Sequence, residues 1–377
     1  MRVLESNTLT LLTTNTCTAQ CAHCCMNSTT TRSGKLAAAE ICDYLEQAAK
    51  SPSIRTIIFA GGEPLLLGED LYTSLRKAKS LKLATRVVTN GYWANSDKRA
   101  LEIVRKLRDA GLDEINISID DYHLDYVDAM NVRRAFYASL QVDFATVVIV
   151  HCTGVNTKFN AKELDELIGM KLDRVYDENG RRLPFTRPEK GPYVAVSNTM
   201  LQYVGRATVE LRPEDVRYSD GWETTSRQLG GCPWAVRAPA ISPSGHLLSC
   251  CGFEVAENEI LDLGDLHNAS MEKLLDEADN DLVLNIIATD GPFAIMDFLK
   301  EADPTLPFRP MYGSYCELCQ HIVTNPTIRQ SLYANMNQRA PAIVEKREKA
   351  LLKLKEDEEF EALYHASDPS PATLQPC

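Results

Sequence analysis

The chain has 377 residues, a formal net charge of −12 and 44% hydrophobic residues. An acidic chain is a poor general binder of nucleic acid, because phosphates need a positive field. No apolar run reaches the ~18 residues that a membrane-spanning helix needs, and residues 1–7 lack the basic flank and apolar stretch of a secretory signal. We therefore expect a cytosolic protein of two or three domains that binds neither membrane nor nucleic acid.

Strand and helix patterns alternate from residue 8 to residue 207. Strands are predicted at 8–14, 54–64, 84–91, 113–121, 143–154 and within 193–207, and helices at 35–51, 68–81, 96–111, 126–141 and 161–172. Such alternation indicates a parallel sheet with helical crossovers of one hand. With about six units instead of the eight of a complete barrel, we predict an α/β fold, a partial (β/α)6 TIM-like barrel. Functional residues should then cluster at the C-terminal ends of the strands.

The pattern changes after about residue 210. We predict a hairpin at 230–253 with its turn at 243–245, helices at 270–278 and 291–302, a loop carrying a Cys-x-x-Cys at 311–320, and one charged surface helix at 337–365. The predicted domains are a core at 1–210, a smaller α+β domain at 211–330, and a terminal helix with a tail at 331–377.

Twelve cysteines are present, and four of them fall within residues 17–25. Cytosolic thiols stay reduced, so clustered cysteines indicate metal ligands or catalytic groups. Cys17, Cys21 and Cys24 have the spacing Cys-x₃-Cys-x₂-Cys in the loop after the first predicted strand. Three thiolates can bind three irons of a [4Fe–4S] cluster and leave the fourth iron open to another ligand. The alternative is a tetrahedral zinc site with His23 or Cys25 as its fourth ligand.

The sequence Gly-Gly-Glu-Pro (61–64) ends the second predicted strand, beside the cysteine loop. Two glycines let a ligand approach the backbone closely. The N–H and C=O groups there could bind an α-amino group or a carboxylate.

Together with "TNG" (89–91), "SID" (118–120) and "VGRA" (204–207), these motifs resemble the radical S-adenosylmethionine (SAM) superfamily over residues 8–210. The resemblance implies a SAM pocket at the strand ends. In that pocket Gly61, Gly62, Glu63 and Pro64 would hold the methionine amino group, Thr89 and Asn90 would face the ligand, Ser118 and Asp120 would lie near the ribose or carboxylate, and His23 would pack near the adenine. It also implies reductive cleavage of SAM to a 5′-deoxyadenosyl radical that abstracts a substrate hydrogen, with a flavodoxin- or ferredoxin-type reductant.

A second set of cysteines follows the predicted barrel. Gly245-x₄-Cys250 followed by Cys316-x₂-Cys319 resembles the auxiliary-cluster domains of radical SAM enzymes. The longer SPASM form has further cysteines, whereas here none follows Cys319 until Cys377, so the pattern resembles the shorter twitch form. The resemblance implies a second [4Fe–4S] cluster with the ligands Cys232, Cys250, Cys316 and Cys319. A structural zinc site on the same thiolates is the alternative, and Cys251 could replace Cys250 or contact substrate.

Tyr122 and His123 lie just beyond a strand end, where they could accept a proton or contact substrate, or simply form a polar loop. The expected substrate is a ribosomally made precursor peptide. The alternatives are a small molecule (an aminocyclitol, sugar or amino acid) that is dehydrogenated or rearranged, and a non-catalytic cysteine-rich metal-binding protein. Because the first predicted strand begins near residue 8, we expect no fused peptide-recognition domain. A peptide substrate would then need a separate recognition protein or direct docking.

Overall fold

The computed structural model describes residues 2–175, 183, 188–216, 230–255, 258–350 and 352. The strands are β1 Thr8–Leu12, β2 Thr56–Ala60, β3 Ala84–Thr89, β4 Glu114–Ser118, β5 Thr146–Thr153, β6 Asp173–Arg174, β7 Tyr193–Met200, β8 Ala240–Ile241, β9 His246–Leu248 and β10 Asp262–Asp265. The helices of the N-terminal half are η1 Pro64–Leu67, α1 Ala38–Lys50, α2 Glu69–Ser80, α3 Asp97–Ala110, α4 Asp121–Leu124, α5 Ala129–Ser139, α6 Ala161–Ile168, α7 Ala207–Glu210 and η2 Pro213–Asp215. Those of the C-terminal half are α9 Met271–Asn280, α10 Leu282–Thr289, α11 Gly291–Ala302, α12 Tyr315–Thr324, α13 Pro326–Asn335 and η3 Met336–Arg339.

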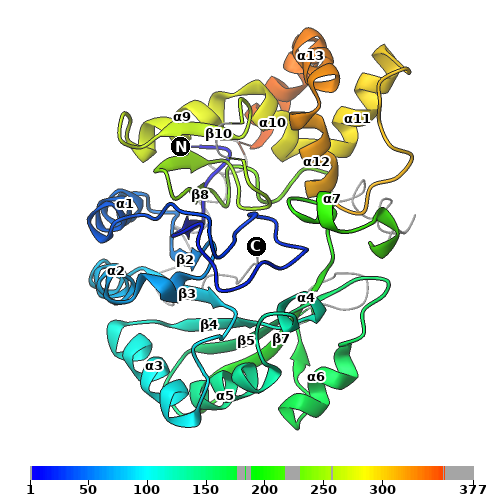
Figure 1. Ribbon diagram of the computed structural model, residues 1–377. Coiled ribbons are helices and arrows are strands. Elements are labelled where there is room, and N and C mark those ends of the chain that lie inside the picture. Colours follow the sequence, from blue (N-terminus) through cyan, green and yellow to red (C-terminus); the bar gives the residue numbers. More distant parts are fainter. Residues whose placement is uncertain are drawn as a thin grey trace.

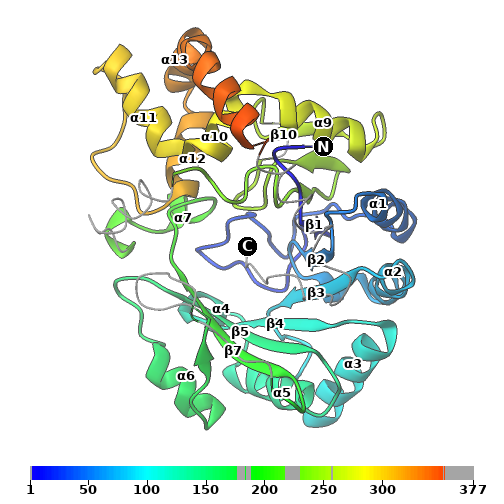
Figure 2. The same cartoon turned by 180° about the vertical axis from the view of Figure 1, so that it is seen from behind.

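The strands form one sheet in the order β10-β9-β8-β1-β2-β3-β4-β5-β7-β6. From β1 to β5 and on to β7 every neighbouring pair is parallel, so the six predicted strand–helix units and the partial-barrel prediction are confirmed. Figure 1 shows α1, α2, α3 and α5 along the outer side of the curved sheet, and the loop after β1 on its inner side. Figure 2 shows the same arrangement from behind. The C-terminal ends of the parallel strands therefore converge on the cysteine loop.

The two faces of the sheet differ in chemistry because side chains alternate along each strand. One face is apolar and fully buried, and includes Leu9, Leu11, Ile57, Phe59, Ile115 and Ile117, all 0% exposed. The other face carries polar groups: Arg86 of β3 lies opposite Glu114 of β4, and their Nε and Oε1 atoms pair at 2.7 Å. A polar inner face suits a ligand-binding interior better than a hydrophobic core.

The C-terminal half continues the same sheet. β8 pairs in parallel with β1, and β9 and β10 follow as antiparallel strands. The predicted hairpin is confirmed, with Gly245 at φ +81° in its turn. The predicted loop at 311–320 holds only for residues 311–314, because Ser314 caps α12 by accepting a hydrogen bond from Glu317 N and the helix begins at Tyr315. Residues 340–350 of the predicted charged helix are helical, and its part from 353 on lies outside the described residues.

No single helix among the described residues is long and apolar enough to cross a membrane. The bent pair α10 and α11, with an angle of 112° between the helices, meets the length and composition criteria only when both are counted together.

Candidate functional site

The loop after β1 brings Cys17, Cys21 and Cys24 together. Its base is closed by backbone hydrogen bonds, among them Cys17 N to Thr29 O at 2.9 Å, and a tight turn joins Cys24 N to Cys21 O at 3.0 Å. Cys21 is 6% exposed. The three thiolate charges act on one another, because Cys17 and Cys24 both contribute to the raised pKa of Cys21. The local spacing thus produces one compact group of three sulfurs.

The chemistry of these thiols fits a bound iron–sulfur cluster. Burial raises the pKa of Cys17 to about 11 and that of Cys21 still further above its ordinary value. Such thiols are neutral when alone and become thiolates when they bind a metal cation, which supplies the missing positive charge. Two donors already point at sulfur: Ala19 N lies 3.4 Å and Asn90 Nδ2 3.7 Å from Cys17 Sγ.

Gly61 and Gly62 bring the end of β2 against the cysteine loop. Gly61 has φ +118°, and a Cβ on Gly62 would lie 2.1 Å from Thr16 O. Gly62 N donates to Thr14 O at 2.6 Å, and Glu63 N to Thr16 O at 3.0 Å. No residue but glycine can allow this approach. Pro64 begins η1 directly behind it.

Glu63 links the second and third strand ends. Its side chain accepts hydrogen bonds from Thr89 Oγ1 at 2.8 Å, Asn90 N at 2.9 Å and Leu65 N at 3.2 Å. It is 1% exposed, and burial raises its pKa to about 7. Asn90 in turn donates to Thr18 Oγ1 at 3.0 Å. The carboxylate therefore orders the strand ends and, through Asn90, the cysteine loop.

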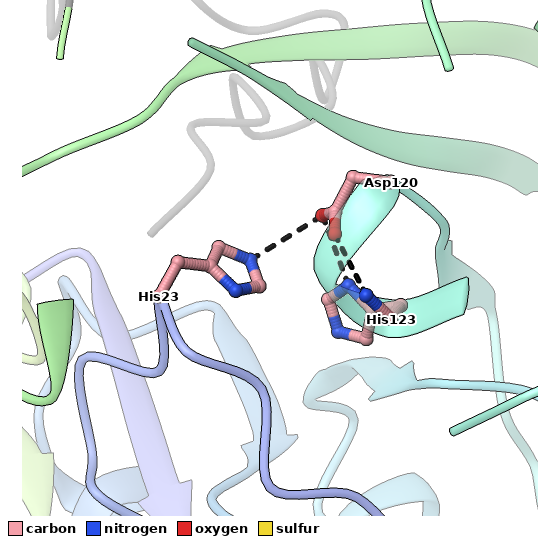
Figure 3. A group of neighbouring side chains, drawn as sticks. All are labelled: His23, Asp120 and His123. Atoms are coloured by element: carbon pink, nitrogen blue, oxygen red, sulfur yellow. Dashed lines mark hydrogen bonds and ion pairs between the residues drawn. The ribbon is translucent and has the colours of Figure 1, made fainter. Parts of the chain in front are cut away.

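His23, Asp120 and His123 form a second polar group at the same edge of the sheet (Figure 3). Asp120 lies two residues after the end of β4. It caps α4 by accepting hydrogen bonds from Tyr122 N and His123 N. Its Oδ2 also lies 2.9 Å from His123 Nδ1 and 3.3 Å from His23 Nε2. Both rings point at this single carboxylate in Figure 3, one from the cysteine loop and one from α4.

The electrostatics of this group keep Asp120 ionised. Burial opposes ionisation, but the charges of His123 and His23 hold the pKa of Asp120 well below its ordinary value. Burial likewise opposes protonation of His123, yet Asp120 raises the pKa of that ring. His23 also stacks on Tyr122, with ring centroids 4.7 Å apart, and its buried Nδ1 has no hydrogen-bond partner among the described residues.

The ligand atoms of His23, Asp120 and His123 lie within 4.8 Å of one another, a spacing that a metal ion could also use. The carboxylate is already shared between the two rings, so an ion would have to displace these hydrogen bonds. The remaining pocket candidate, Ser118, ends β4 and is 8% exposed. His23, Asp120, Ser118 and the Glu63 group therefore all lie at one edge of the sheet, next to the three cysteines.

The distal cysteines also come together, from three separate segments. Cys232 precedes β8, Cys250 follows β9, and Cys316 and Cys319 lie in the first turns of α12. A Cβ on Gly252 would lie 2.9 Å from Cys316 Sγ and 4.0 Å from Cys250 Sγ. The charges of Cys250, Cys232 and Cys316 all act on Cys319. Cys316 and Cys319 are three residues apart in α12, so their side chains lie on the same face of the helix.

Burial raises the pKa of every distal thiol, to about 11 for Cys250 and beyond that for Cys316 and Cys319. As in the first group, a bound cation would stabilise the thiolates. Cys251 is 9% exposed and lies next to this group in the chain.

Cys25 connects the two groups, which sequence spacing alone did not indicate. Its carbonyl accepts a hydrogen bond from Glu254 N at 3.1 Å, so it lies beside the segment that carries Cys250. The charges of Cys24, Cys250 and Cys316 all interact with Cys25. The only signal in the sequence was the adjacency of Cys24 and Cys25, since neighbouring side chains tend to point apart.

Arg206 is a further site residue that spacing did not single out. The "VGRA" motif places it beneath the cysteine loop, where it is 7% exposed. Its Nη1 donates to Cys21 O at 2.9 Å and its Nη2 to Ser28 O at 2.5 Å.

Comparison with known proteins finds a family match within the N-terminal half of the chain. Residues 11–142 match the radical SAM superfamily. The putative peptide biosynthesis protein YydG of Bacillus subtilis is 21% identical over 321 residues, which cover 84% of this chain and 92% of that protein. A probable GTP 3′,8-cyclase of Sulfolobus acidocaldarius is 34% identical over 184 residues, or 47% of this chain and 55% of that protein.

Among solved structures, a histidine-tagged anSMEcpe with bound AdoMet has a TM-score of 0.50 at 14% identity, and the match covers 90% of this chain and 98% of that chain. This likeness is one of fold. Residues 11–142 match the radical SAM family model, and that family implies SAM and a [4Fe–4S] cluster as cofactors.

Proposed function

We propose that this radical SAM enzyme is a peptide maturase that carries two [4Fe–4S] clusters, one at each cysteine group. The observation that carries the proposal is the separation of seven buried or half-buried thiols into a group of three and a group of four, which adjoin at Cys24 and Cys25. Three thiolates leave one iron open for SAM, whereas four complete a cluster. A single structural zinc ion needs only four ligands, so it would account for one of the two cysteine groups and leave the other unexplained.

At the first group, Cys17, Cys21 and Cys24 would bind the cluster. When bound there, the cluster supplies the electron that splits SAM into methionine and a 5′-deoxyadenosyl radical. The chain keeps the site dry and ordered: Cys21 and Glu63 are nearly fully buried, and the hydrogen bonds of Glu63 hold the ends of β2 and β3 in place. Exclusion of water protects a reactive radical from side reactions.

The SAM pocket would lie along the strand ends beside the cysteine loop. Gly61 to Pro64, Thr89, Asn90, Ser118 and Asp120 are the proposed pocket residues. Asp120 keeps the His23 ring oriented through the 3.3 Å contact, and the flat face of that ring suits an adenine. His123 and Tyr122, in α4 directly after Asp120, are the proposed groups to accept or return a proton.

At the second group, Cys232, Cys250, Cys316 and Cys319 would hold an auxiliary cluster, and a closed set of four ligands suits electron transfer. Substrate hydrogen abstraction leaves a carbon radical, and dehydrogenation or crosslinking requires loss of one more electron from it. The four thiols lie on the second domain, which we place at 211–330 between the core at 1–210 and the terminal segment at 331–377.

The peptide substrate is proposed from a relative that matches 84% of this chain and whose name describes peptide biosynthesis. A separate recognition protein and a flavodoxin- or ferredoxin-type reductant complete the proposed partners. A small-molecule substrate is the second candidate, favoured by the match to a nucleotide-converting cyclase at 34% identity.

The test is anaerobic purification followed by reconstitution and assay. We expect a brown protein with about eight irons, if two cubane clusters form, and dithionite-dependent formation of 5′-deoxyadenosine. Incubation with SAM, dithionite and short peptides encoded beside its gene should change the mass of one peptide. A mass change only in a nucleotide or sugar would favour the second candidate. A colourless protein that binds zinc alone would refute both.

A further inference from the structure

Arg206 is a buried cation that contacts backbone carbonyls of the cysteine loop. It is 7% exposed, and no acidic side chain pairs with it in the part of the chain that the structure describes. The three hydrogen bonds that it donates all go to carbonyls of the cysteine loop: Nη1 to Cys21 O, Nη2 to Ser28 O, and its backbone N to Cys24 O at 3.0 Å. An unpaired buried charge is costly unless something nearby compensates it.

The backbone before Arg206 is shaped for this contact. Gly205 has φ +56°, and a Cβ there would lie 2.5 Å from Cys25 O and 2.7 Å from Cys24 O. The glycine therefore lets the chain approach the two carbonyls, and the guanidinium then reaches Cys21 O on the same loop. The guanidinium contacts the carbonyl of Cys21, which carries one of the three sulfurs, and the carbonyl of Ser28.

We infer that Arg206 is a positioning residue that also supplies the positive charge for the cluster at Cys17, Cys21 and Cys24, and that it raises the reduction potential of that cluster. Reduction adds one electron, and hence one negative charge, to a group held by three thiolates. A cation in the same poorly solvated region favours the reduced form. This inference rests on the proposed placement of the cluster.

A second arginine on the same loop provides a matched control. Arg32 Nη1 donates to Met26 O at 2.9 Å, as Arg206 does to other loop carbonyls, but Arg32 also forms an ion pair with Glu254. The two side chains of this pair are 34% and 28% exposed. Replacing both by glutamine removes a loop contact without changing the net charge.

The experiment is a redox titration of the full reconstituted protein. The readout is the electron paramagnetic resonance signal that changes when SAM is added. Such a change identifies the cluster with the open iron and separates it from the distal one. The variants are Arg206→Gln, Arg206→Lys and the double variant Arg32→Gln/Glu254→Gln.

We expect Arg206→Gln to lower the reduced fraction at a fixed potential by on the order of tenfold, the scale of one charge acting over roughly 10 Å at an effective dielectric constant of about 20. Arg206→Lys keeps the charge and should restore most of that fraction. The double variant should titrate like the wild type. An unchanged potential in Arg206→Gln, or an equal shift in the double variant, would overturn the inference.

Should Arg206→Gln fail to take up iron, Arg206→His decides the matter. Its reduced fraction at a fixed potential should then fall more between pH 6, where imidazole is charged, and pH 8.5 than that of the wild type, in which Glu63 also titrates in this range. The same response to pH in both proteins would overturn the inference. A wild-type protein with no SAM-responsive signal would instead refute the proposed function, so the two failures are distinguishable.

Discussion

The two cysteine groups are built in opposite ways. The first takes its three thiols from eight consecutive residues of one loop, closed at its base by backbone hydrogen bonds such as Cys17 N to Thr29 O. The second takes its four thiols from segments spread between residues 232 and 319, on the flank of β8, the end of β9 and the start of α12. One group is local, and the other exists only when three elements pack together.

This difference predicts different roles in stability. A local loop can keep its shape when its metal is lost, because its own hydrogen bonds remain. A group that joins distant segments closes long loops, so its metal should stabilise the fold more. Gly231 shows how closely the segment that carries Cys232 packs on α10, since a Cβ there would lie 1.9 Å from Ala288 O near the end of that helix.

The largest expected effect is on SAM cleavage. Cys17→Ala, Cys21→Ala or Cys24→Ala should abolish 5′-deoxyadenosine formation under dithionite, measured by chromatography, because each removes one of only three cluster ligands. Cys25→Ala is the matched control and should retain cleavage, since Cys25 lies beside the distal segment. Cleavage by Cys24→Ala together with its loss in Cys25→Ala would make Cys25 the third ligand.

The next effect separates the two groups. Cys316→Ala/Cys319→Ala should lose about half of the iron if each group holds one cubane cluster, and should still form 5′-deoxyadenosine without modified substrate. Cys42→Ala, in α1 and outside both groups, is the control. Soluble, monodisperse protein is required for the comparison. Full iron content or normal product yield in the double variant would show that these two thiols do not serve a working cluster.

The third prediction concerns Glu63, whose hydrogen bonds to Thr89 and Asn90 order the strand ends beside the N-terminal cysteine group. Burial raises its pKa from 4.5 to about 7, so the folded state holds the proton more tightly than the unfolded state. The resulting contribution to stability is present below pH 4.5 and is lost as the pH rises through about 7. The loss should be on the order of 3 kcal/mol.

The measurement is chemical denaturation of the cluster-free protein at pH 5 and pH 8. Glu63→Gln does not titrate, so its free energy of unfolding should fall less between these two values than that of the wild type. Other titrating groups cancel in the difference between the two proteins. Parallel pH dependences would show that Glu63 has an ordinary pKa.

The smallest effect concerns Gly252 in the distal group. A Cβ there would lie 2.9 Å from Cys316 Sγ, a side-chain atom that can shift, so Gly252→Ala should cost about 1 kcal/mol. The electron paramagnetic resonance signal of the distal cluster should change, and the protein should still cleave SAM. Gly205→Ala should cost more, because its Cβ would meet two backbone carbonyls at positive φ. A change in SAM cleavage by Gly252→Ala would mean that the two groups are not independent.

Much of this protein could be predicted from local sequence. The alternation of strands and helices predicted the parallel sheet, since period and turn residues are properties of short segments. The three N-terminal cysteines and the Gly-Gly-Glu-Pro motif were likewise apparent, because a single loop and a single strand end bring them together. The hairpin turn at residues 243–245 followed from the same kind of local signal.

Tertiary structure alone decided the rest. The Cys-x-x-Cys at 316–319 was predicted as a loop, but Ser314 caps α12 and this helix packs against α11 and α13, so the motif is helical. The meeting of His23 with Asp120, of Cys25 with the distal segment, and of Arg206 with Cys21 O each joins residues far apart in the chain. No short-range pattern encodes such contacts, because they depend on how the sheet curves and where its strand ends converge.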